Sequence, residues 1–174
     1  MINFLITNSL LLVQNLPAYK KYSMKQSFLF VSFLCSVLFV SLASFGPGKN
    51  TNLIQDVLSQ TNLFRKSKGL TELMLKNELN AIAQQHSADM ASGRVAFGHD
   101  GFAKRNMMAG AAISQLHSFA ENVAYGATSG KQVVSLWKSS PGHRQNMLGN
   151  YKYIGIGIAK DKQGRFFYTE VFAG

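Results

Sequence analysis

Cysteine is almost absent from this sequence. The single cysteine among 174 residues, Cys35, lies near the N-terminus, so no disulfide can form within the chain. Beyond residue 35 the chain therefore offers neither a thiolate metal site nor a cysteine nucleophile. A domain of this size can bury a sizeable apolar core, and that core must carry the stability of the fold by itself.

Acidic residues are also scarce. The chain has 8 Asp and Glu against 18 Lys and Arg, which gives a net charge of +10. From residue 50 onward 14 basic and 8 acidic residues remain, a difference of +6. The basic residues are scattered, with no Arg-rich run and no basic strand interleaved with aromatics, so we expect no nucleic-acid partner. The charge favours weak attraction to anionic surfaces.

Residues 28–45 form an uncharged and strongly apolar run. Three lysines at 20, 21 and 25 precede it, and Ser41 and Ala43 are the small residues of a cleavage site. This pattern predicts a leader over 1–46 with a signal peptide cut after Ala43, and Met24 is the expected true start. Two alternatives are an uncleaved anchor and a lipoprotein, the latter disfavoured by the bulky Leu34 before Cys35. All three place the following domain outside the cytoplasm, secreted or in the cell envelope.

Helical patterns dominate the first part of the remaining chain, and strands end it. Apolar spacing predicts helices ending at Gly69 and Gly93, a weaker helix over 102–114 and another over 131–139. The second helix carries His86 on its apolar stripe, where a histidine is expected to be a core residue. Alternating residues over 152–160 and 165–174 predict a hairpin, whose Gly155 and Gly157 allow close packing on one face. This order predicts an α+β fold.

A two-turn helix within 139–150, "SSPGHRQNMLGN", has both of its ends marked. Ser140 suits the N-cap, Pro141 the first helical position and Gly149 the residue past the end. His143 lies in the first turn, where the positive end of the helix dipole disfavours a cation. A histidine there is expected to stay neutral, with a free nitrogen available as a base or metal ligand.

Five motifs in series resemble the CAP superfamily, also called the SCP domain, which includes cysteine-rich secretory proteins, antigen 5 and pathogenesis-related proteins. They are "GHD" at 98–100, "ENVAYG" at 121–126, "VVSLWKSSPGHRQNML" at 133–148, "YIGIGIA" at 153–159 and "YTEVFAG" at 168–174. The resemblance is nearest to the disulfide-free bacterial branch and covers 52–174. It implies a CAP-type α-β-α sandwich, with helices around a small antiparallel sheet and a C-terminal hairpin.

The same resemblance implies a cleft lined by two histidines and two glutamates. His99, His143 and Glu121 match three of these positions, and Ser140 stands where the second glutamate would be. Two imidazoles and a carboxylate could hold a divalent metal such as zinc with positions left for water. These three residues are therefore the expected metal ligands, and the catalytic residues if there is an activity.

Three further residues are candidates for the cleft or its surroundings. Ser140 lies before the histidine-bearing helix, and His117 lies four residues before Glu121, where it flanks the cleft or faces solvent. Glu170 shares a strand face with aromatic residues, so it must be paired or line the cleft, with Arg144 a possible partner. Tyr125 and Trp137 are expected in the core.

Three functions compete for this site. The first is a secreted binding module for a metal and a small, lipid-like or cell-surface polymer ligand; the lost second carboxylate favours it over catalysis. The second is a metal-assisted hydrolase of peptidase type, in which Glu121 and the histidines activate water. The third is a hydrogen-bond network with a structural role only. A monomer is expected, with no stable membrane partner if the leader is cleaved.

Overall fold

A computed structural model describes residues 49–174. The predicted signal peptide, its cleavage site and the start at Met24 lie outside the described residues. Among residues 49–174, none of the helices combines the length and apolarity needed to cross a bilayer.

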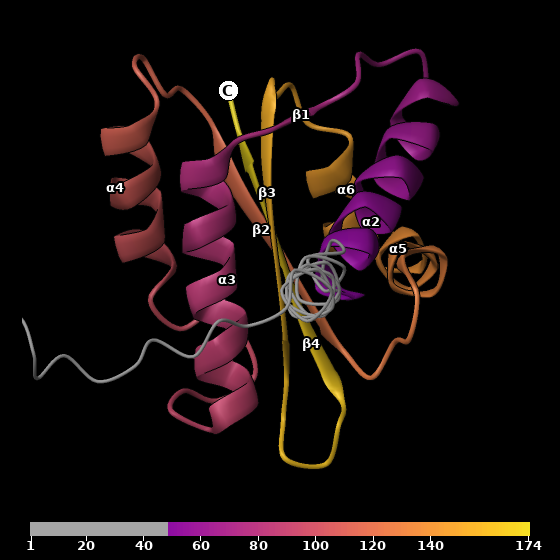
Figure 1. The fold of residues 1–174 in the computed structure, drawn as a ribbon. Coiled ribbons are helices and arrows are strands. Elements are labelled where there is room, and N and C mark those ends of the chain that lie inside the picture. Colours follow the sequence, from indigo (N-terminus) through magenta and orange to yellow (C-terminus); the bar gives the residue numbers. More distant parts are fainter. Residues whose placement is uncertain (1–48) are drawn as a thin grey trace, which may run out of the picture. The chain divides into compact units, whose positions relative to one another are not determined.

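Helices and one four-stranded sheet make up the described chain, in three layers (Figure 1). The elements are, in order, α2 (Lys49–Lys66), β1 (Met74–Leu75), α3 (Asn77–Ser92), α4 (Phe102–Ala112), β2 (Phe119–Tyr125), α5 (Gly130–Ser139), α6 (Pro141–Met147), β3 (Tyr153–Lys160) and β4 (Phe166–Ala173). Helices α3 and α4 cover one face of the sheet, and α2, α5 and α6 cover the other. The α+β sandwich predicted from the sequence is therefore confirmed.

The sheet is mixed rather than purely antiparallel. Its strand order is β1-β3-β4-β2, with β3–β4 and β2–β4 antiparallel and the two-residue β1 parallel to β3. The sequence predicted neither β1 nor the strand over 119–125. Beyond β1, no strand among residues 49–174 pairs with this edge of β3. Side chains of α3 satisfy its N–H groups instead: Asn80 and Gln84 accept hydrogen bonds from the N–H groups of Ile156 and Ile158.

The two faces of β3 differ as the alternation of its sequence predicts. Gly155 and Gly157 face α3, and a Cβ on Gly157 would lie 2.1 Å from a backbone atom of Ala83. The glycines therefore let the helix backbone approach the strand directly. The isoleucines at 154, 156 and 158 point to the other face and are fully buried there.

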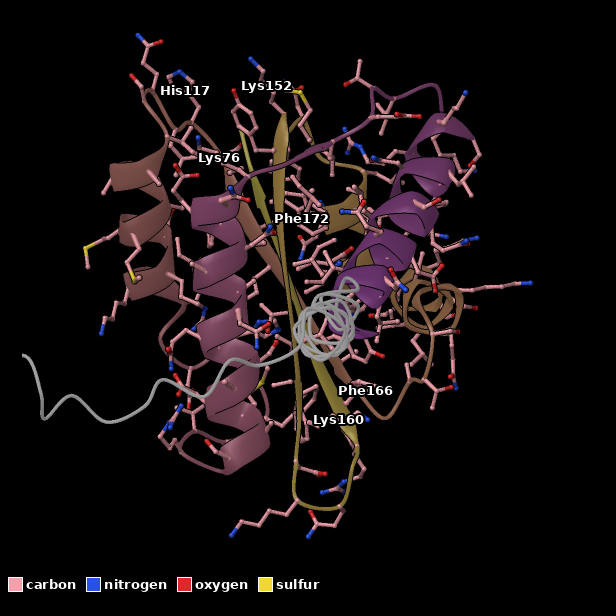
Figure 2. The ribbon with its side chains drawn as sticks, in the orientation of Figure 1. Lys76, His117, Lys152, Lys160, Phe166 and Phe172 are labelled. Atoms are coloured by element: carbon pink, nitrogen blue, oxygen red, sulfur yellow. The ribbon has the colours of Figure 1, made fainter. Side chains whose placement is uncertain are left out.

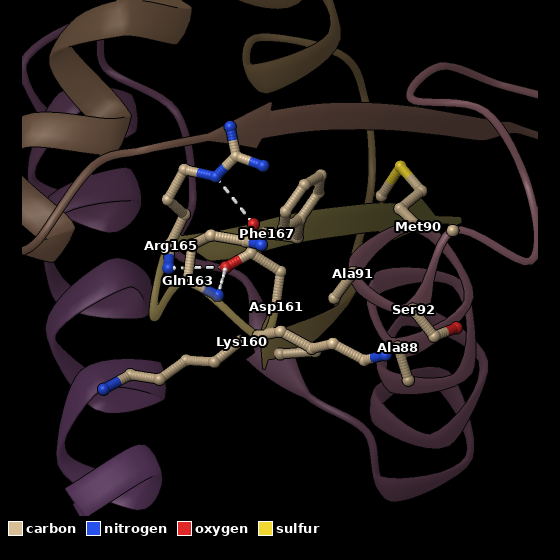
Figure 3. A pocket seen from close by; sticks show the side chains of 12 residues that line it. Ala88, Met90, Ala91, Ser92, Lys160, Asp161, Gln163, Arg165 and Phe167 are labelled. Atoms are coloured by element: carbon tan, nitrogen blue, oxygen red, sulfur yellow. Dashed lines mark hydrogen bonds and ion pairs between the residues drawn. The ribbon is translucent and has the colours of Figure 1, made fainter.

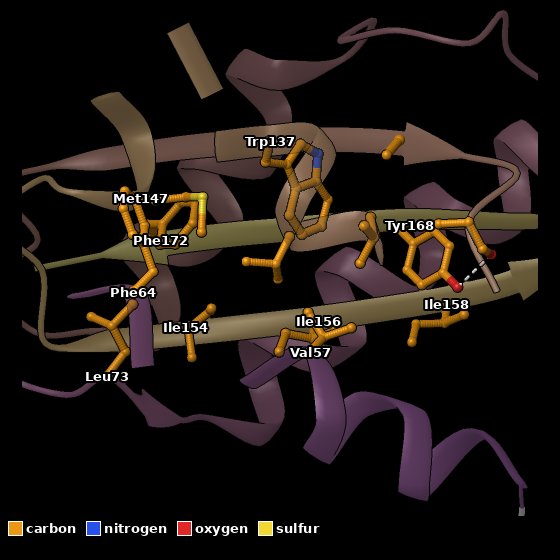
Figure 4. Close-up of a cluster of buried hydrophobic side chains, with 14 of the residues drawn as sticks. Val57, Phe64, Leu73, Trp137, Met147, Ile154, Ile156, Ile158, Tyr168 and Phe172 are labelled. Atoms are coloured by element: carbon orange, nitrogen blue, oxygen red, sulfur yellow. Dashed lines mark hydrogen bonds between the residues drawn. The ribbon is translucent and has the colours of Figure 1, made fainter. Parts of the chain in front are cut away.

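The main core lies between the sheet and the layer of α2, α5 and α6 (Figure 4). Trp137 of α5, predicted as a core residue, is 1 % exposed and packs among aliphatic side chains from β3 and α2. Its indole Nε1 donates a hydrogen bond to the carbonyl of Val123 on the edge strand β2. Tyr125, also predicted in the core, is instead 50 % exposed at the end of β2, beside Phe97 and Phe167.

The helices end near the predicted residues, but the side chain of Ser140 and the backbone of Gly149 do not play the expected capping roles. Gly93 ends α3 in the left-handed conformation (φ 75°), as expected. Ser140 occupies the N-cap position of α6 and Pro141 its first turn, but the Ser140 side chain makes no capping bond. Gly149 has no positive φ; its lack of a side chain is needed because a Cβ would lie 2.2 Å from the Tyr151 ring.

Candidate functional site

Glu121 is the centre of a buried polar cluster on the edge strand β2. Its side chain points to the α3/α4 face of the sheet and is 0 % exposed. A buried carboxylate is costly unless it is paired and hydrogen-bonded, so its partners decide what it can do.

Arg105 of α4 is the principal partner of Glu121. Its Nε lies 2.5 Å from Oε2 and its Nη2 lies 2.7 Å from Oε1, a two-pronged pairing that uses both carboxylate oxygens. Sequence reasoning did not predict this residue, because Arg105 reads as an ordinary charge in a weak helix. The available signal was that Arg105, one of two cations in an Ala- and Met-rich helix, falls 16 residues before the key glutamate.

The loop that carries His99 is fixed by the same cluster. Arg105 donates to the carbonyls of Asp100 and His99, at 2.7 and 3.3 Å. His86, buried on α3 as predicted, donates from Nε2 to the carbonyl of Gly98 at 2.9 Å. Burial lowers the pKa of His86, so the ring stays neutral and acts as a structural support for the loop.

His99 faces solvent on one side and Glu121 on the other. Its Nδ1 lies 2.9 Å from Glu121 Oε1, and the side chain is 49 % exposed. The carboxylate can only accept, so the hydrogen of this bond is on Nδ1, and Nε2 is the ring nitrogen directed away from the carboxylate. This is the arrangement in which a carboxylate orients a histidine for metal binding.

His143 approaches His99 from the opposite layer. The centroids of the two rings are 6.5 Å apart, with the planes tilted by 49°. The helix that carries His143 is tied to β2: Asn122 donates to the His143 carbonyl at 3.1 Å, and Asn146 donates to the Glu121 carbonyl at 3.0 Å. Burial and the nearby His99 lower the pKa of His143, so its ring stays neutral at pH 7.

The structure thus brings His99, Glu121 and His143 together but leaves the other three candidates elsewhere. Ser140 precedes α6 without a side-chain bond, and His117 is exposed at the end of the sheet where β4 ends (Figure 2). Glu170 lies on the opposite face of the sheet from Glu121. It is connected to the histidines only indirectly, through Asn122.

Glu170 is fully buried and paired with neutral groups. Thr61 of α2 donates to its Oε1 at 2.7 Å, Asn122 is its cross-strand neighbour on β2, and its Oε2 has no partner. Burial raises its pKa to about 8, so Glu170 is protonated at pH 7. The alternative of an ion pair with Arg144 is wrong, because Arg144 is exposed and makes no contact with it.

Two hollows lie near this region, and neither is lined by the histidine pair. One of about 280 Å³ lies between α3 and α4, and its lining includes His86, Asp100 and Arg105. Another of about 510 Å³ lies between the end of α3 and the β3–β4 turn, where Asp161 pairs with Arg165 (Figure 3). His99 and His143 therefore meet outside both hollows, at the edge of the sheet.

Comparison with known proteins identifies the family. The model of the CAP family, described as the cysteine-rich secretory protein family, matches residues 58–172. The chain belongs to the CAP family. This agrees with the resemblance carried by the five sequence motifs, and the histidine pair and Glu121 lie within the matched part.

Several of the similar proteins are bacterial. An uncharacterised Bacillus subtilis protein, YkwD, is 29 % identical over 126 residues, which cover 68 % of this chain and 46 % of that protein. The structure of an extracellular SCP-domain protein from Bacillus anthracis matches with a TM-score of 0.59 at 26 % identity, over 71 % of this chain and 40 % of that one. A cysteine-rich secretory protein from Staphylococcus aureus matches with a TM-score of 0.60 at 24 % identity, over 74 % and 40 %. This chain spans less than half the length of each of these proteins.

The donor set limits how a metal could be held. Within the described residues, no group of three or more His, Cys, Asp or Glu side chains is arranged to share an ion. Glu121 directs both oxygens to Arg105 and His99, so it is suited to orient a ligand rather than to be one. The imidazoles of His99 and His143 remain as the groups that fit a cation.

Proposed function

We propose that this CAP protein is an extracellular binding module that holds a divalent cation, such as zinc, between His99 and His143. The observation that carries the proposal is the pair of imidazoles presented from two layers of the fold, with ring centroids 6.5 Å apart, of which burial keeps His143 neutral. Export by the N-terminal leader is part of this proposal. Water or a small, lipid-like or polymer ligand would complete the coordination.

Glu121 acts in this proposal as the residue that orients His99. Its bond to Nδ1 leaves Nε2 directed away from the carboxylate, and Arg105 holds Glu121 itself in place. Two imidazoles make a weaker zinc site than the three or four protein ligands of catalytic and structural centres. We therefore expect an exchangeable ion, bound more loosely than a structural zinc.

The hydrolase alternative has less support from the same contacts. A general base needs a free lone pair directed at the reacting water, and both oxygens of Glu121 are already bonded to cationic or N–H donors. The serine before the helix offers no better starting point, because Ser140 bonds to neither histidine in the described residues.

The structural alternative is favoured by one specific observation. Arg105, Glu121 and His86 form a buried network that ties α4, β2 and α3 to the loop of residues 98–100. This network would hold the fold whether or not an ion binds. It therefore accounts for Glu121, but it leaves the exposed side of His99 and the whole ring of His143 unused.

Calorimetric titration of the purified protein with Zn²⁺ tests the proposal. We expect saturable binding that is lost in both His99→Gln and His143→Gln, while His117→Gln, an exposed histidine elsewhere on the sheet, binds as the parent does. Equal binding by all three variants would mean adventitious surface binding and would refute the proposal. Absence of binding by the parent, together with lowered melting temperatures of the two site variants, would leave the structural network as the function of the cluster.

A further inference from the structure

A hollow of about 380 Å³ on the α2/α5/α6 side of the molecule has an all-basic rim. It is lined by Phe64 from the end of α2, Lys68 from the turn after α2, Lys138 from the end of α5, Arg144 from α6 and Leu148, the residue after α6. We call these five residues the basic hollow. No acidic side chain lines it, and two apolar side chains form part of its wall.

The three rim cations are unpaired. Within the described residues, Lys68, Lys138 and Arg144 form no ion pair, whereas other exposed basic residues, such as Arg94 and Arg165, do. Lys138 is held over the ring of Phe64, with its Nζ 5.0 Å from the ring centroid. This cation–π contact keeps the ammonium group at the hollow while leaving its three donors free.

A fourth cation, Arg65, is buried next to Phe64 in the chain and does not itself line the hollow. Arg65 is 1 % exposed and donates to the carbonyls of Thr71, Met147 and Gly149, with no carboxylate among its partners. These bonds join the end of α2 to the end of α6, so they fix the two walls relative to each other. Arg65 also adds a buried positive charge next to Phe64.

Helix ends alone do not balance this charge. Lys68, Lys138 and Arg144 lie at or near the C-terminal ends of helices, where the helix dipole favours cations. Each such end carries roughly half a negative charge. Three ends therefore offset about one and a half of four positive charges, which leaves about two and a half charges without compensation.

We propose that the basic hollow is a second binding site, for a small organic phosphate ester. The phosphate oxygens would accept hydrogen bonds from Lys68, Lys138 and the planar fork of Arg144, which suits a phosphate in a bidentate manner. The carbon part of the ligand would lie against Phe64 and Leu148. This inference goes beyond the proposed cation site and does not depend on it.

Binding of sn-glycerol 3-phosphate, followed by calorimetry and by amide chemical shifts, tests the proposal. We expect saturable binding that weakens as salt is added, with the largest shifts around residues 64–68, 138 and 144–148. The variant Lys68→Gln/Lys138→Gln/Arg144→Gln should lose about tenfold or more in affinity, because it removes several charge-assisted hydrogen bonds. All three side chains are exposed, so the variant is expected to fold, which its thermal unfolding checks.

The matched control removes the same charge elsewhere. Lys104→Gln/Lys131→Gln/Lys162→Gln also replaces three exposed, unpaired cations. It should bind glycerol 3-phosphate within about twofold of the parent, because only general charge has changed. An equal loss in both triple variants would show a non-specific effect of net charge and would overturn the proposal, as would a parent protein that binds neither glycerol 3-phosphate nor vesicles containing phosphatidylglycerol.

Two further binding measurements distinguish a free phosphate ester from a phospholipid headgroup as the ligand. The parent and the hollow variant are compared for binding to inorganic phosphate and to phosphatidylcholine vesicles containing phosphatidylglycerol. Loss of vesicle binding in the hollow variant, without binding of the soluble ester, would assign a lipid headgroup; the reverse would assign a free ester. A variant with His99→Gln should bind both probes as the parent does, which separates this site from the proposed cation site.

Discussion

Glu170 allows the strongest quantitative test of the fold. Its carboxyl is fully buried and its pKa is raised from 4.5 to about 8. Below pH 4.5 the folded and unfolded states are both protonated, so burial adds no pH dependence. Between pH 4.5 and 8 only the unfolded state releases its proton, and the folded state loses about 1.4 kcal/mol of stability for each pH unit. The loss is about 3 kcal/mol at pH 7 and levels off near 5 kcal/mol above pH 8.

The substitution Glu170→Gln removes this loss, because an amide is neutral at every pH. Its Oε1 can still accept from Thr61, and its amide group would replace the carboxyl oxygen that has no partner. We expect the free energy of unfolding of the variant, relative to the parent, to increase by about 4 kcal/mol between pH 5 and pH 8.

Urea unfolding followed by fluorescence measures this difference, because Trp137 is the single tryptophan and is buried next to the same core. Taking the difference between the two proteins at each pH cancels the titration of the histidines. Glu72→Gln, an exposed glutamate, is the control and should give a flat difference. A flat difference for Glu170→Gln as well would refute the assignment of a protonated, buried carboxyl.

Three further predictions concern the site and the packing of α3. Arg105→Met should lower stability by about 3–5 kcal/mol in urea unfolding, because it leaves the carboxylate of Glu121 buried without its cation. Gly157→Ala should cost about 3 kcal/mol or prevent folding, because a Cβ there would overlap the backbone of Ala83. NMR titration of His143 should give a midpoint below 6.5; the folded state disfavours the protonated ring, so this histidine lowers stability as the pH falls below 6.5.

The first two of these predictions have matched controls. Arg94→Met breaks an exposed pair with Asp89 and should cost less than about 1 kcal/mol. Gly142→Ala adds a Cβ in the first turn of α6 with nothing within 4 Å, so it should be nearly neutral. If Arg94→Met lowered stability as much as Arg105→Met, burial of the ion pair would not be the cause of the loss. If Gly142→Ala lowered it as much as Gly157→Ala, the close approach of α3 to β3 would not be the cause. A His143 midpoint at or above 6.5 would contradict the third prediction.

Much of the fold was predictable because its signals are local. The Ile-Gly alternation over 153–159 specifies a strand with one aliphatic face and one face that a helix can approach, and the structure has both. The strand β2 was not predicted, because its pattern of Glu121 and Asn122 between apolar residues reflects burial of polar side chains on both faces. The two-residue β1 was not predicted either, because it depends on pairing with β3, which lies 79 residues further along the chain.

The site could be predicted only as far as the family motifs reach. These motifs point to His99, Glu121 and His143, and the fold brings them together. They do not reveal that Arg105 occupies both oxygens of Glu121, because ion pairing across 16 residues depends on how α4 packs against β2. The environment of Glu170 was equally hidden, since its bond to Thr61 joins residues 109 positions apart.

The hydrogen bonds of Arg65 bear on the redox conditions in which the fold is stable. Its guanidinium connects α2 to carbonyls 82 and 84 residues further along the chain, a span that small exported domains often bridge with cystine. Thiols play no part in this connection, and the only sulfhydryl in the sequence precedes the domain. The hydrogen bonds of Arg65 to these distant carbonyls therefore form in reducing and oxidising surroundings alike, and their strength is independent of redox potential.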